Sequence, residues 1–258
     1  MKTKYDIVLN ENNHRYYVNG VPKVSVTTYL KILDKPGLNT WTLKKTVAYI
    51  GGHLPDLRAD DLTEEKAIEI LKKAKDYARE IAQKEADVGK QIHDLIHQHL
   101  LGEKIYIKEF EERAQNGFNA AKGWIEEVKF KPLEIEMLVY HPTMDYCGRL
   151  DTVGMIGKLE NTFSVIDWKS TDLYKDTGEK KPIYAEMKIQ PVAYALAYAN
   201  MYDYDTDKID VWVVRLDKKT GDVDPYQLSK EEIASCGDAF CGCIMAHDAI
   251  KEVNKKRR

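Results

Sequence analysis

The chain has 258 residues, of which 43% are hydrophobic and 31% are charged, and its formal net charge is −3. A chain of this length can form one large domain or two small ones around a sizeable core. It contains no run of about 18 apolar residues, which argues against a membrane span, and its N-terminal residues are too polar for an export signal. We therefore expect an intracellular, cytoplasmic protein with no membrane partner.

The charges are distributed unevenly. Residues 1–50 hold eight Lys or Arg against three Asp or Glu, and residues 251–258 hold five against one, so the remaining residues carry about −12. Nucleic-acid-binding domains usually have a basic excess, which the pI near 6.2 does not indicate. The two basic ends are candidates for phosphate contacts, although solvated tails are the commoner explanation.

Four cysteines occur, and three of them, Cys236, Cys241 and Cys243, lie close together near the C-terminus. Disulfides are not expected in an intracellular chain. The spacing C-x4-C-x-C does not match the common ligand runs of iron–sulfur clusters. The three cysteines fall among apolar residues as small helix-packing residues do, so an iron–sulfur cluster is not expected.

The first half of the chain is predicted to be mainly helical. It opens with a hairpin over 5–9 and 15–18, and Ser25 then begins a short helix that ends before Pro36 and Gly37. Further helices are predicted at 40–50, ended by Gly51-Gly52; at 61–81, capped by Asp61 and Thr63; at 88–101, after an interruption at Gly89; and at 109–128.

From Pro132 onward the pattern changes to strands. Strands are predicted at 133–140, 148–156, 162–168, 208–216 and 223–228, with a helix at 184–202 and a last helix that begins at the capping box of Ser229 and Glu232. This order indicates an α/β (α+β) fold with a mixed central β-sheet flanked by helices. We expect a helical N-terminal region over 1–130 and a sheet-containing core over 131–258, packed as one compact unit.

Three charged residues stand at the strands of this core. Asp151 lies within the second strand, and Asp167 is followed two residues later by Lys169 at the end of the third. Two carboxylates can hold a divalent cation that polarises a phosphate and activates a water. A nearby lysine can orient or deprotonate that water and offset charge on the transition state. The three residues therefore indicate metal-assisted phosphodiester cleavage.

Two more motifs accompany them in a fixed order: Gly89-x-x-x-His93 upstream and Gln190-x-x-x-Tyr194 on the following helix. Together the motifs resemble those of the PD-(D/E)XK nuclease superfamily, specifically its RecB-like branch, over about residues 86–198. That branch includes phage exonucleases, CRISPR-associated nucleases and the mitochondrial genome maintenance exonuclease. The resemblance implies a restriction-endonuclease-like core.

The resemblance also implies roles for these residues. Asp151 and Asp167 would bind Mg²⁺ or Mn²⁺ together with the main-chain carbonyl of Trp168, because hard cations prefer oxygen ligands. His93 would be a further ligand and would shift the preference towards Mn²⁺. Lys169 would lie next to the scissile phosphate. The remaining candidates are Gln190 and Tyr194, which would face the site, and Glu136, which matches a first-strand glutamate of the branch.

Each residue could instead have a purely structural role. Asp151 could pair with Arg149 or Lys169, and Lys169 would then be an ion-pair partner only. His93 could be an ordinary surface or core histidine. Glu134 and Glu136, which alternation places on one face, could form a solvated strand edge. Gln190 and Tyr194 could serve helix packing.

Aromatic and basic residues near the N-terminus are candidates for substrate contacts. Tyr16, Tyr17 and Trp41 could stack on unpaired bases, while Lys23, Lys44 and Lys45 take phosphates. Core packing claims most aromatic residues of this kind. The N-terminal helices are nevertheless the best candidate for a wall over a single-stranded path.

The function expected from the resemblance is a Mg²⁺- or Mn²⁺-dependent DNase. We expect an exonuclease on single-stranded DNA or DNA ends, in recombination, repair or phage DNA processing, with recombination or replication proteins as partners. No P-loop motif occurs, so any helicase would be another chain. Two rivals stay open: an endonuclease or flap nuclease with the same site, and an inactive nucleic-acid-binding or assembly protein. Strand polarity, DNA or RNA preference, the number of metals and the oligomeric state are not determined.

Overall fold

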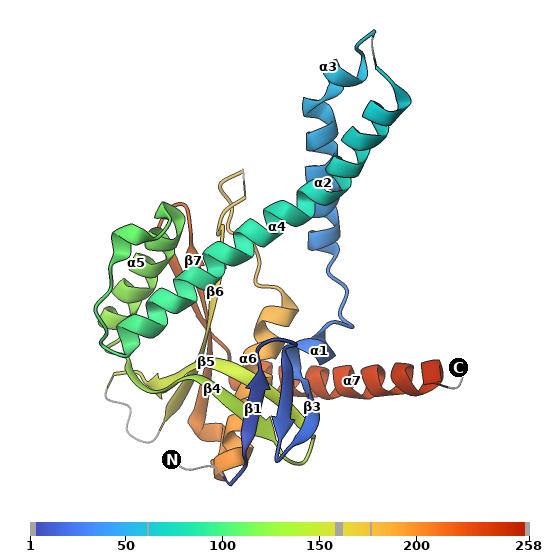
Figure 1. Ribbon diagram of the computed structural model, residues 1–258. Coiled ribbons are helices and arrows are strands. Elements are labelled where there is room, and N and C mark those ends of the chain that lie inside the picture. Colours follow the sequence, from blue (N-terminus) through green and yellow to red (C-terminus); the bar gives the residue numbers. More distant parts are fainter. Residues whose placement is uncertain (1–3, 61, 158–161, 176, 256–258) are drawn as a thin grey trace. The chain divides into compact units, whose positions relative to one another are not determined.

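The computed structural model describes residues 4–60, 62–157, 162–175 and 177–255 (Figure 1). The chain divides into two compact units, Met1–Leu33 with Gln91–Arg258, and Asp34–Lys90. Residues 130 and 131, between which the sequence suggested a domain boundary, both belong to the first unit. None of the helices in the described ranges combines the length and the apolar character that a membrane span requires.

The first unit is built on an eight-stranded sheet in the order β1-β2-β3-β5-β6-β7-β8, with β4 paired to β5. The pairs β3–β5 and β6–β7 are parallel and the others antiparallel, so the expected mixed sheet is confirmed. The strands are β1 Ile7–Asn10, β2 Arg15–Val18, β3 Val21–Ser25, β4 Lys131–His141, β5 Tyr146–Met155, β6 Phe163–Thr171, β7 Ile209–Asp217 and β8 Val223–Gln227.

Helices cover both faces of this sheet. The first unit contains α1 Val26–Leu30, α5 Glu112–Glu127, α6 Ala185–Tyr202, α7 Lys230–Lys255, the single turns η1 Ile107–Glu109 and η2 Thr206–Lys208, and the last part of α4 Glu64–Leu100. On one face, the ring of Trp124 on α5 packs edge-on against that of Trp168 on β6, with 5.6 Å between the ring centres. The centre of the Trp124 ring lies 5.8 Å from that of Trp212 on β7. Val211 and Val213, the β7 residues on either side of Trp212, point to the opposite face and belong to the same hydrophobic cluster as residues of α6. This alternation means that β6 and β7 are buried on both sides.

The second unit consists of α2 Pro36–Gly52, α3 Leu54–Leu57 and the first part of α4. The centre of the Tyr49 ring on α2 lies 4.9 Å from that of Tyr77 on α4. The same ring stacks on His53, with 4.2 Å between the ring centres. Ala74 and Ala78 of α4 are fully buried. The aromatic contact between Tyr49 and Tyr77 thus joins the two longer helices of this unit.

Two local expectations were wrong. Gly89 does not interrupt the helix, because α4 runs unbroken from Glu64 to Leu100; a glycine inside a helix costs about 1 kcal/mol, which packing can offset, and Gly89 is buried. Pro36 begins α2 rather than only ending the previous helix, since proline is well suited to a first helical turn.

The remaining expectations about strands and helix caps have mixed outcomes. The expected cap Asp61 lies outside the described residues, and the sequence did not predict β3. The expected capping box of Ser229 and Glu232 is confirmed, since the two residues bond reciprocally. The expected helix start at Ser25 is confirmed as well, and there Thr28 N donates to Ser25 Oγ.

Glu232 should make the fold sensitive to acid. Hydrogen bonds from Lys188, Tyr226 and the Ser229 amide lower the pKa of Glu232 from 4.5 to about 2. A depressed pKa stabilises the folded state above pH 4.5 and loses that contribution as the pH falls towards 2. We expect the urea midpoint of Glu232→Gln to lie below that of wild type at neutral pH and to converge with it near pH 2. The control is Glu252→Gln, which removes an exposed pair with Lys255 from the same helix; an equal loss in the control would contradict this assignment.

Candidate metal centre

Strands β5 and β6 bring the two expected aspartates next to each other. The main-chain amide of Trp168 donates a hydrogen bond of 2.8 Å to Asp151 Oδ2. Asp167, the residue before Trp168, is 1% exposed and lies on β6. The side chain of Asp151 is thereby tied to the backbone of the strand that carries Asp167 and Lys169.

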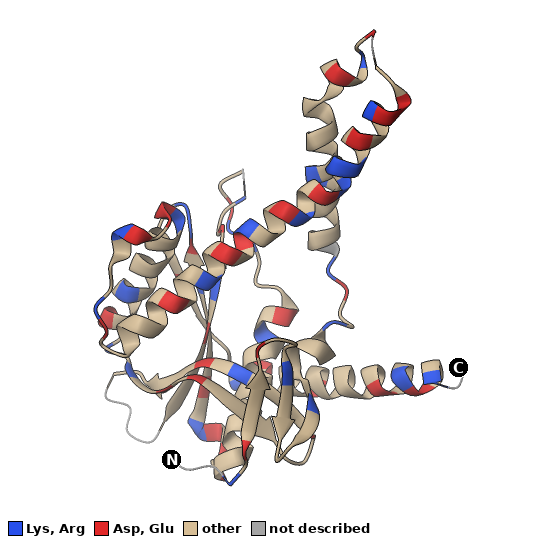
Figure 2. Ribbon diagram, viewed as in Figure 1, with Lys and Arg blue, Asp and Glu red and all other residues tan. Residues whose placement is uncertain are grey.

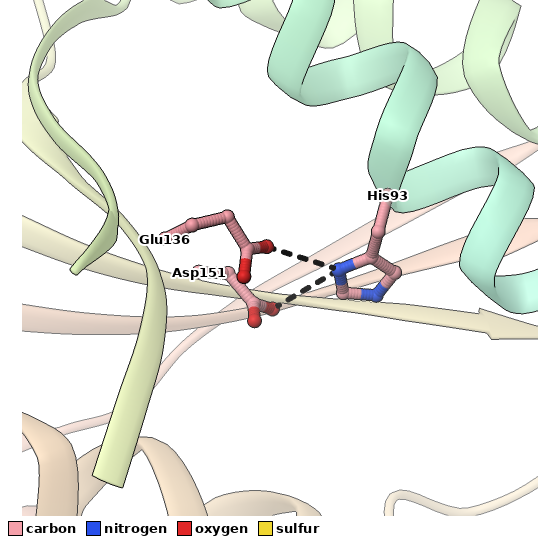
Figure 3. Close-up of side chains that lie close together, drawn as sticks. All are labelled: His93, Glu136 and Asp151. Atoms are coloured by element: carbon pink, nitrogen blue, oxygen red, sulfur yellow. Dashed lines mark ion pairs between the residues drawn. The ribbon is translucent and has the colours of Figure 1, made fainter. Parts of the chain in front are cut away.

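His93 reaches the same place from α4. Its Nε2 lies 3.1 Å from the main-chain oxygen of Trp168, and its Nδ1 lies 3.8 Å from Asp151 Oδ2 and 3.9 Å from Glu136 Oε1 (Figure 3). Donor atoms of His93, Glu136 and Asp151, the metal-ligand cluster, all fall within 4.8 Å of one another. Burial alone would lower the pKa of His93, but the carboxylates of Asp151 and Glu136 outweigh it and raise the pKa to about 9. The imidazole is therefore protonated beside the two carboxylates, and it would give up that proton in order to ligate a cation.

Glu136 enters the cluster through an irregularity of β4. The register pairs Ile135 with Thr152 and Met137 with Leu150, which leaves Glu136 opposite Asp151 without a regular pair. Its φ is +50°, a backbone conformation that non-glycine residues adopt at a cost and that concentrates at functional sites. Glu134 has different surroundings, because its charge acts on Tyr198 and Tyr202.

Asp167, which is buried, forms an ion pair with Lys169, whose side chain is 22% exposed. Lys169 Nζ lies 2.7 Å from Asp167 Oδ2, yet within the described part of the chain neither oxygen of Asp167 has a hydrogen-bond partner of good geometry. Burial raises the pKa of Asp167 to about 6, with Lys169 opposing the rise and Asp151 adding to it. Burial lowers the pKa of Lys169, but Asp167 and Asp151 reverse this and raise it. An incompletely compensated buried carboxylate is expensive, so this one calls for a cation.

A hydrogen-bonded chain from α6 positions Lys169. Lys169 Nζ donates to Gln190 Oε1 at 3.1 Å, and Gln190 Nε2 donates to Tyr194 Oη at 2.9 Å. The ring of Tyr194 packs against Gly148, where a Cβ atom would overlap it. Because 4% of Tyr194 is exposed, contact of its phenol with a substrate would require the side chain to move, whereas its contact with Gln190 is already formed.

Two ion pairs that the sequence suggested do not form. Lys169 pairs with Asp167 rather than with Asp151. Arg149 pairs with Glu136 and with Glu11, at 3.0 and 3.3 Å, rather than with Asp151. Sequence adjacency on β5 suggested Arg149 as a partner of Asp151, but Glu136 on the neighbouring strand is the carboxylate within its reach.

The expected substrate-binding residues fall into two groups. Tyr16, on β2, is half-buried, and the charges that act on its hydroxyl include those of Arg149, Glu11 and Glu136, so it lies near the metal-ligand cluster. Trp41, Lys44 and Lys45 lie on α2 in the second unit, where Lys45 Nζ is 5.8 Å from the centre of the Trp41 ring.

The donor set fits a divalent cation. It offers carboxylates, one imidazole and the carbonyl of Trp168, which are ligands that Mg²⁺ and especially Mn²⁺ accept. The 3.1 Å between His93 Nε2 and Trp168 O is the length of a hydrogen bond, whereas Nδ1 of the same ring lies near the carboxylates of Asp151 and Glu136. Asp151 and Glu136 could hold the ion together with Nδ1 of His93, and Asp167 and the Trp168 carbonyl lie beside them.

The sequence did not single out Arg149 or Glu11 as site residues. A signal was available, because Arg149 precedes Asp151 by two positions on one strand and therefore shares its face. Glu11 gave none, since its position depends on how the first hairpin folds back towards β5.

Comparison with known proteins agrees with this geometry. The family model described as "PD-(D/E)XK nuclease superfamily" matches residues 61–249, which is most of the chain and includes all the residues of the cluster. No curated protein matches the chain in a sequence search.

Two solved structures show limited similarity. A candidate exonuclease from Eubacterium rectale has 14% identity and a TM-score of 0.36 over 55% of each chain. An alkaline exonuclease from Laribacter hongkongensis has 18% identity and a TM-score of 0.30, over 54% of this chain and 70% of that one. The chain spans about half the length of the first of these proteins, and TM-scores this low do not by themselves establish a shared fold or activity.

The packing of Tyr194 on Gly148 should be intolerant of any added atom. We expect Gly148→Ala to destabilise the protein by about 1–3 kcal/mol, the usual cost of overpacking a core, because the new methyl group overlaps the Tyr194 ring. Urea unfolding measures the change. Gly242→Ala is the control: Gly242 lies in α7 with open space around it, so alanine should stabilise by up to about 1 kcal/mol. A neutral Gly148→Ala would show that the ring is not held there.

Proposed function

The chain belongs to the PD-(D/E)XK nuclease superfamily, and on that premise we propose that it is a Mg²⁺- or Mn²⁺-dependent deoxyribonuclease of the RecB-like branch that degrades DNA from ends with single-stranded character. One observation carries the proposal. His93 and Asp151 meet at the main chain of Trp168, where Asp151 accepts a hydrogen bond from the amide and His93 Nε2 lies 3.1 Å from the carbonyl oxygen. The Asp167–Lys169 pair stands on the adjoining residues of β6. An ordinary structural ion pair would not need an imidazole and two further carboxylates.

The cation, when bound, would polarise the scissile phosphate and lower the pKa of a water. The side chains around it have separate tasks. Asp151 is held by the Trp168 amide, so its carboxylate is fixed before any ion arrives. Lys169 is held by Gln190 and Asp167, which aims a positive charge at the place where charge develops on the phosphate. Tyr194 keeps the Gln190 amide in the orientation in which its oxygen faces Lys169.

Action on single-stranded ends is supported by the resemblance to exonucleases of the branch and by α2. This helix carries Lys44 and Lys45 and has no acidic residue, whereas acidic and basic residues are mixed along α4 (Figure 2). The Trp41–Lys45 pair offers a stacking surface and a phosphate contact on one helix. A setting in recombination, repair or phage DNA processing, with proteins of those processes as partners, belongs to the same proposal.

Cleavage should require both the cation and Lys169. We expect labelled single- and double-stranded DNA to be digested with Mg²⁺ or Mn²⁺ and not with EDTA, and we expect Lys169→Met to reduce the rate by at least about 100-fold, because it removes a charge aimed at the transition state. Lys175→Met is the matched control, since Lys175 follows the same strand and pairs with exposed Glu179.

The outcome also tests the rival of another class. A protein that binds nucleic acid without cutting it would show no metal-dependent digestion, and Asp167→Ala and Lys169→Ala would leave its binding intact. Such a result would remove the nuclease proposal for this chain.

Blocked substrates distinguish the exonuclease from the endonuclease or flap nuclease. The residues of the metal-ligand cluster can explain how a phosphodiester is cleaved, but they do not determine whether a DNA strand must enter the site by a free end. We expect circular single-stranded DNA, and linear DNA blocked at both ends, to resist digestion while the unblocked linear strand is degraded. Cutting of the circle at a rate similar to that of the linear strand would favour the endonuclease instead.

A further inference from the structure

Arg149 is a charged residue of this region that the proposed chemistry does not use. It lies on β5 two residues before Asp151, and 43% of its side chain is exposed. Its Nε lies 3.0 Å from Glu136 Oε2, and the other oxygen of Glu136 lies 3.9 Å from His93 Nδ1. The guanidinium therefore contacts one member of the metal-ligand cluster and is partly exposed to solvent.

Charge makes an arginine at this place useful. Glu136, Asp151 and Asp167 put three carboxylates where a phosphodiester has to approach, and Lys169 is already paired with Asp167. A strand of DNA brings a negative charge on every phosphate, including those next to the one being cut. A divalent cation offsets charge at the scissile phosphate, but the neighbouring phosphate needs its own cation. The planar fork of arginine binds phosphate oxygens in pairs.

The present partners of Arg149 are ones that a substrate complex can replace. Glu136 belongs to the group of donors that could hold a cation, and a cation at its other oxygen would draw on the negative charge that now holds Arg149. Glu11, the second partner, is 66% exposed in the turn between β1 and β2, and it lies 3.3 Å from Arg149 Nη1. A phosphate can take the place of such an exposed carboxylate at little cost, because exposed ion pairs contribute little.

A rival explanation is that Arg149 only ties the first hairpin to the sheet. The hairpin has other attachments: Asp6 and Asn19 bond to each other at its base, and β2 continues through β3 to β5. The charges that act on Tyr16, Arg149 among them, also show that the side of the hairpin next to Arg149 borders the metal-ligand cluster. A tether alone would not require the guanidinium to share a carboxylate with that cluster.

We propose that Arg149 binds a backbone phosphate of the DNA strand next to the phosphate at the metal centre, and that Glu136 couples this contact to the cation by leaving Arg149 for the ion. The inference rests on the proposed function. It makes Arg149 a substrate-binding residue and Glu11 the carboxylate that occupies the guanidinium when no DNA is present.

The test is binding of a fluorescein-labelled single-stranded oligodeoxynucleotide, followed by anisotropy over a series of salt concentrations with Ca²⁺ present and the oligonucleotide checked for intactness. We expect Arg149→Gln to weaken binding about tenfold, the effect of losing a hydrogen bond to a charged group, and to reduce the slope of log affinity against log salt by about 0.7, the value for one contact to a single strand. Arg149→Lys should keep the slope and lose part of the affinity, because it keeps the charge without the fork.

Two variants separate binding from tethering and from net charge. Glu11→Gln breaks the same ion pair as Arg149→Gln but should bind DNA at least as tightly as wild type. Arg113→Gln removes the same charge from α5, where Arg113 pairs with Asp172, and should leave the salt slope unchanged. Equal weakening by Glu11→Gln and Arg149→Gln, or a wild-type affinity and slope for Arg149→Gln, would overturn the inference.

Failure of the proposed function gives a different result. In that case the wild-type protein does not cut DNA with Mg²⁺ or Mn²⁺, whether or not it binds the oligonucleotide. If wild type binds and cuts while Arg149→Gln behaves like it, the nuclease stands and the role of Arg149 alone is rejected.

Discussion

The carboxylate of Asp167 sits on a strand that is covered on both faces, and its burial is the constraint around which the site is arranged. A carboxylate in such a place must be compensated, and Lys169 does so only in part, since both oxygens of Asp167 lack a well-formed hydrogen bond in the described structure. Asp151, His93 and the Trp168 carbonyl lie close by. A cation bound among these groups would offset the cost of that burial.

The supporting residues show how the fold keeps this arrangement in place. Gln190 and Tyr194 form a hydrogen-bonded chain that ends on Lys169, and Gly148 leaves the space for the Tyr194 ring. On the other side, Ile92 next to His93 packs tightly over Gly117 of α5. Gly148 thus allows α6, which carries Gln190 and Tyr194, to approach β5 closely, and Gly117 allows α4, which carries His93, to approach α5 closely.

The left-handed backbone at Glu136 links the metal centre to the outer surface of the site. In a regular strand, Glu136 would point to the same face of the sheet as Glu134, because residues two apart share a face. With the left-handed backbone, Glu136 lies between His93 and Arg149. One carboxylate can then respond both to an ion and to the arginine that faces the solvent, which gives the proposed nuclease a physical route by which metal and substrate binding influence each other.

The sequence by itself determined the motifs and most of the elements, because strand and helix periodicities and the caps at Ser25 and Ser229 are local properties. It also placed Asp151, Asp167, Lys169, Gln190 and His93 in the order of a known nuclease superfamily. Only the tertiary structure decided the ion-pair partners, which are Asp167 for Lys169 and Glu136 and Glu11 for Arg149. It also decided that Glu136 has a left-handed backbone conformation and no regular strand pair. Those choices depend on strand register, on a positive φ at a non-glycine residue and on the return of a distant hairpin, none of which leaves a periodic signal in the chain.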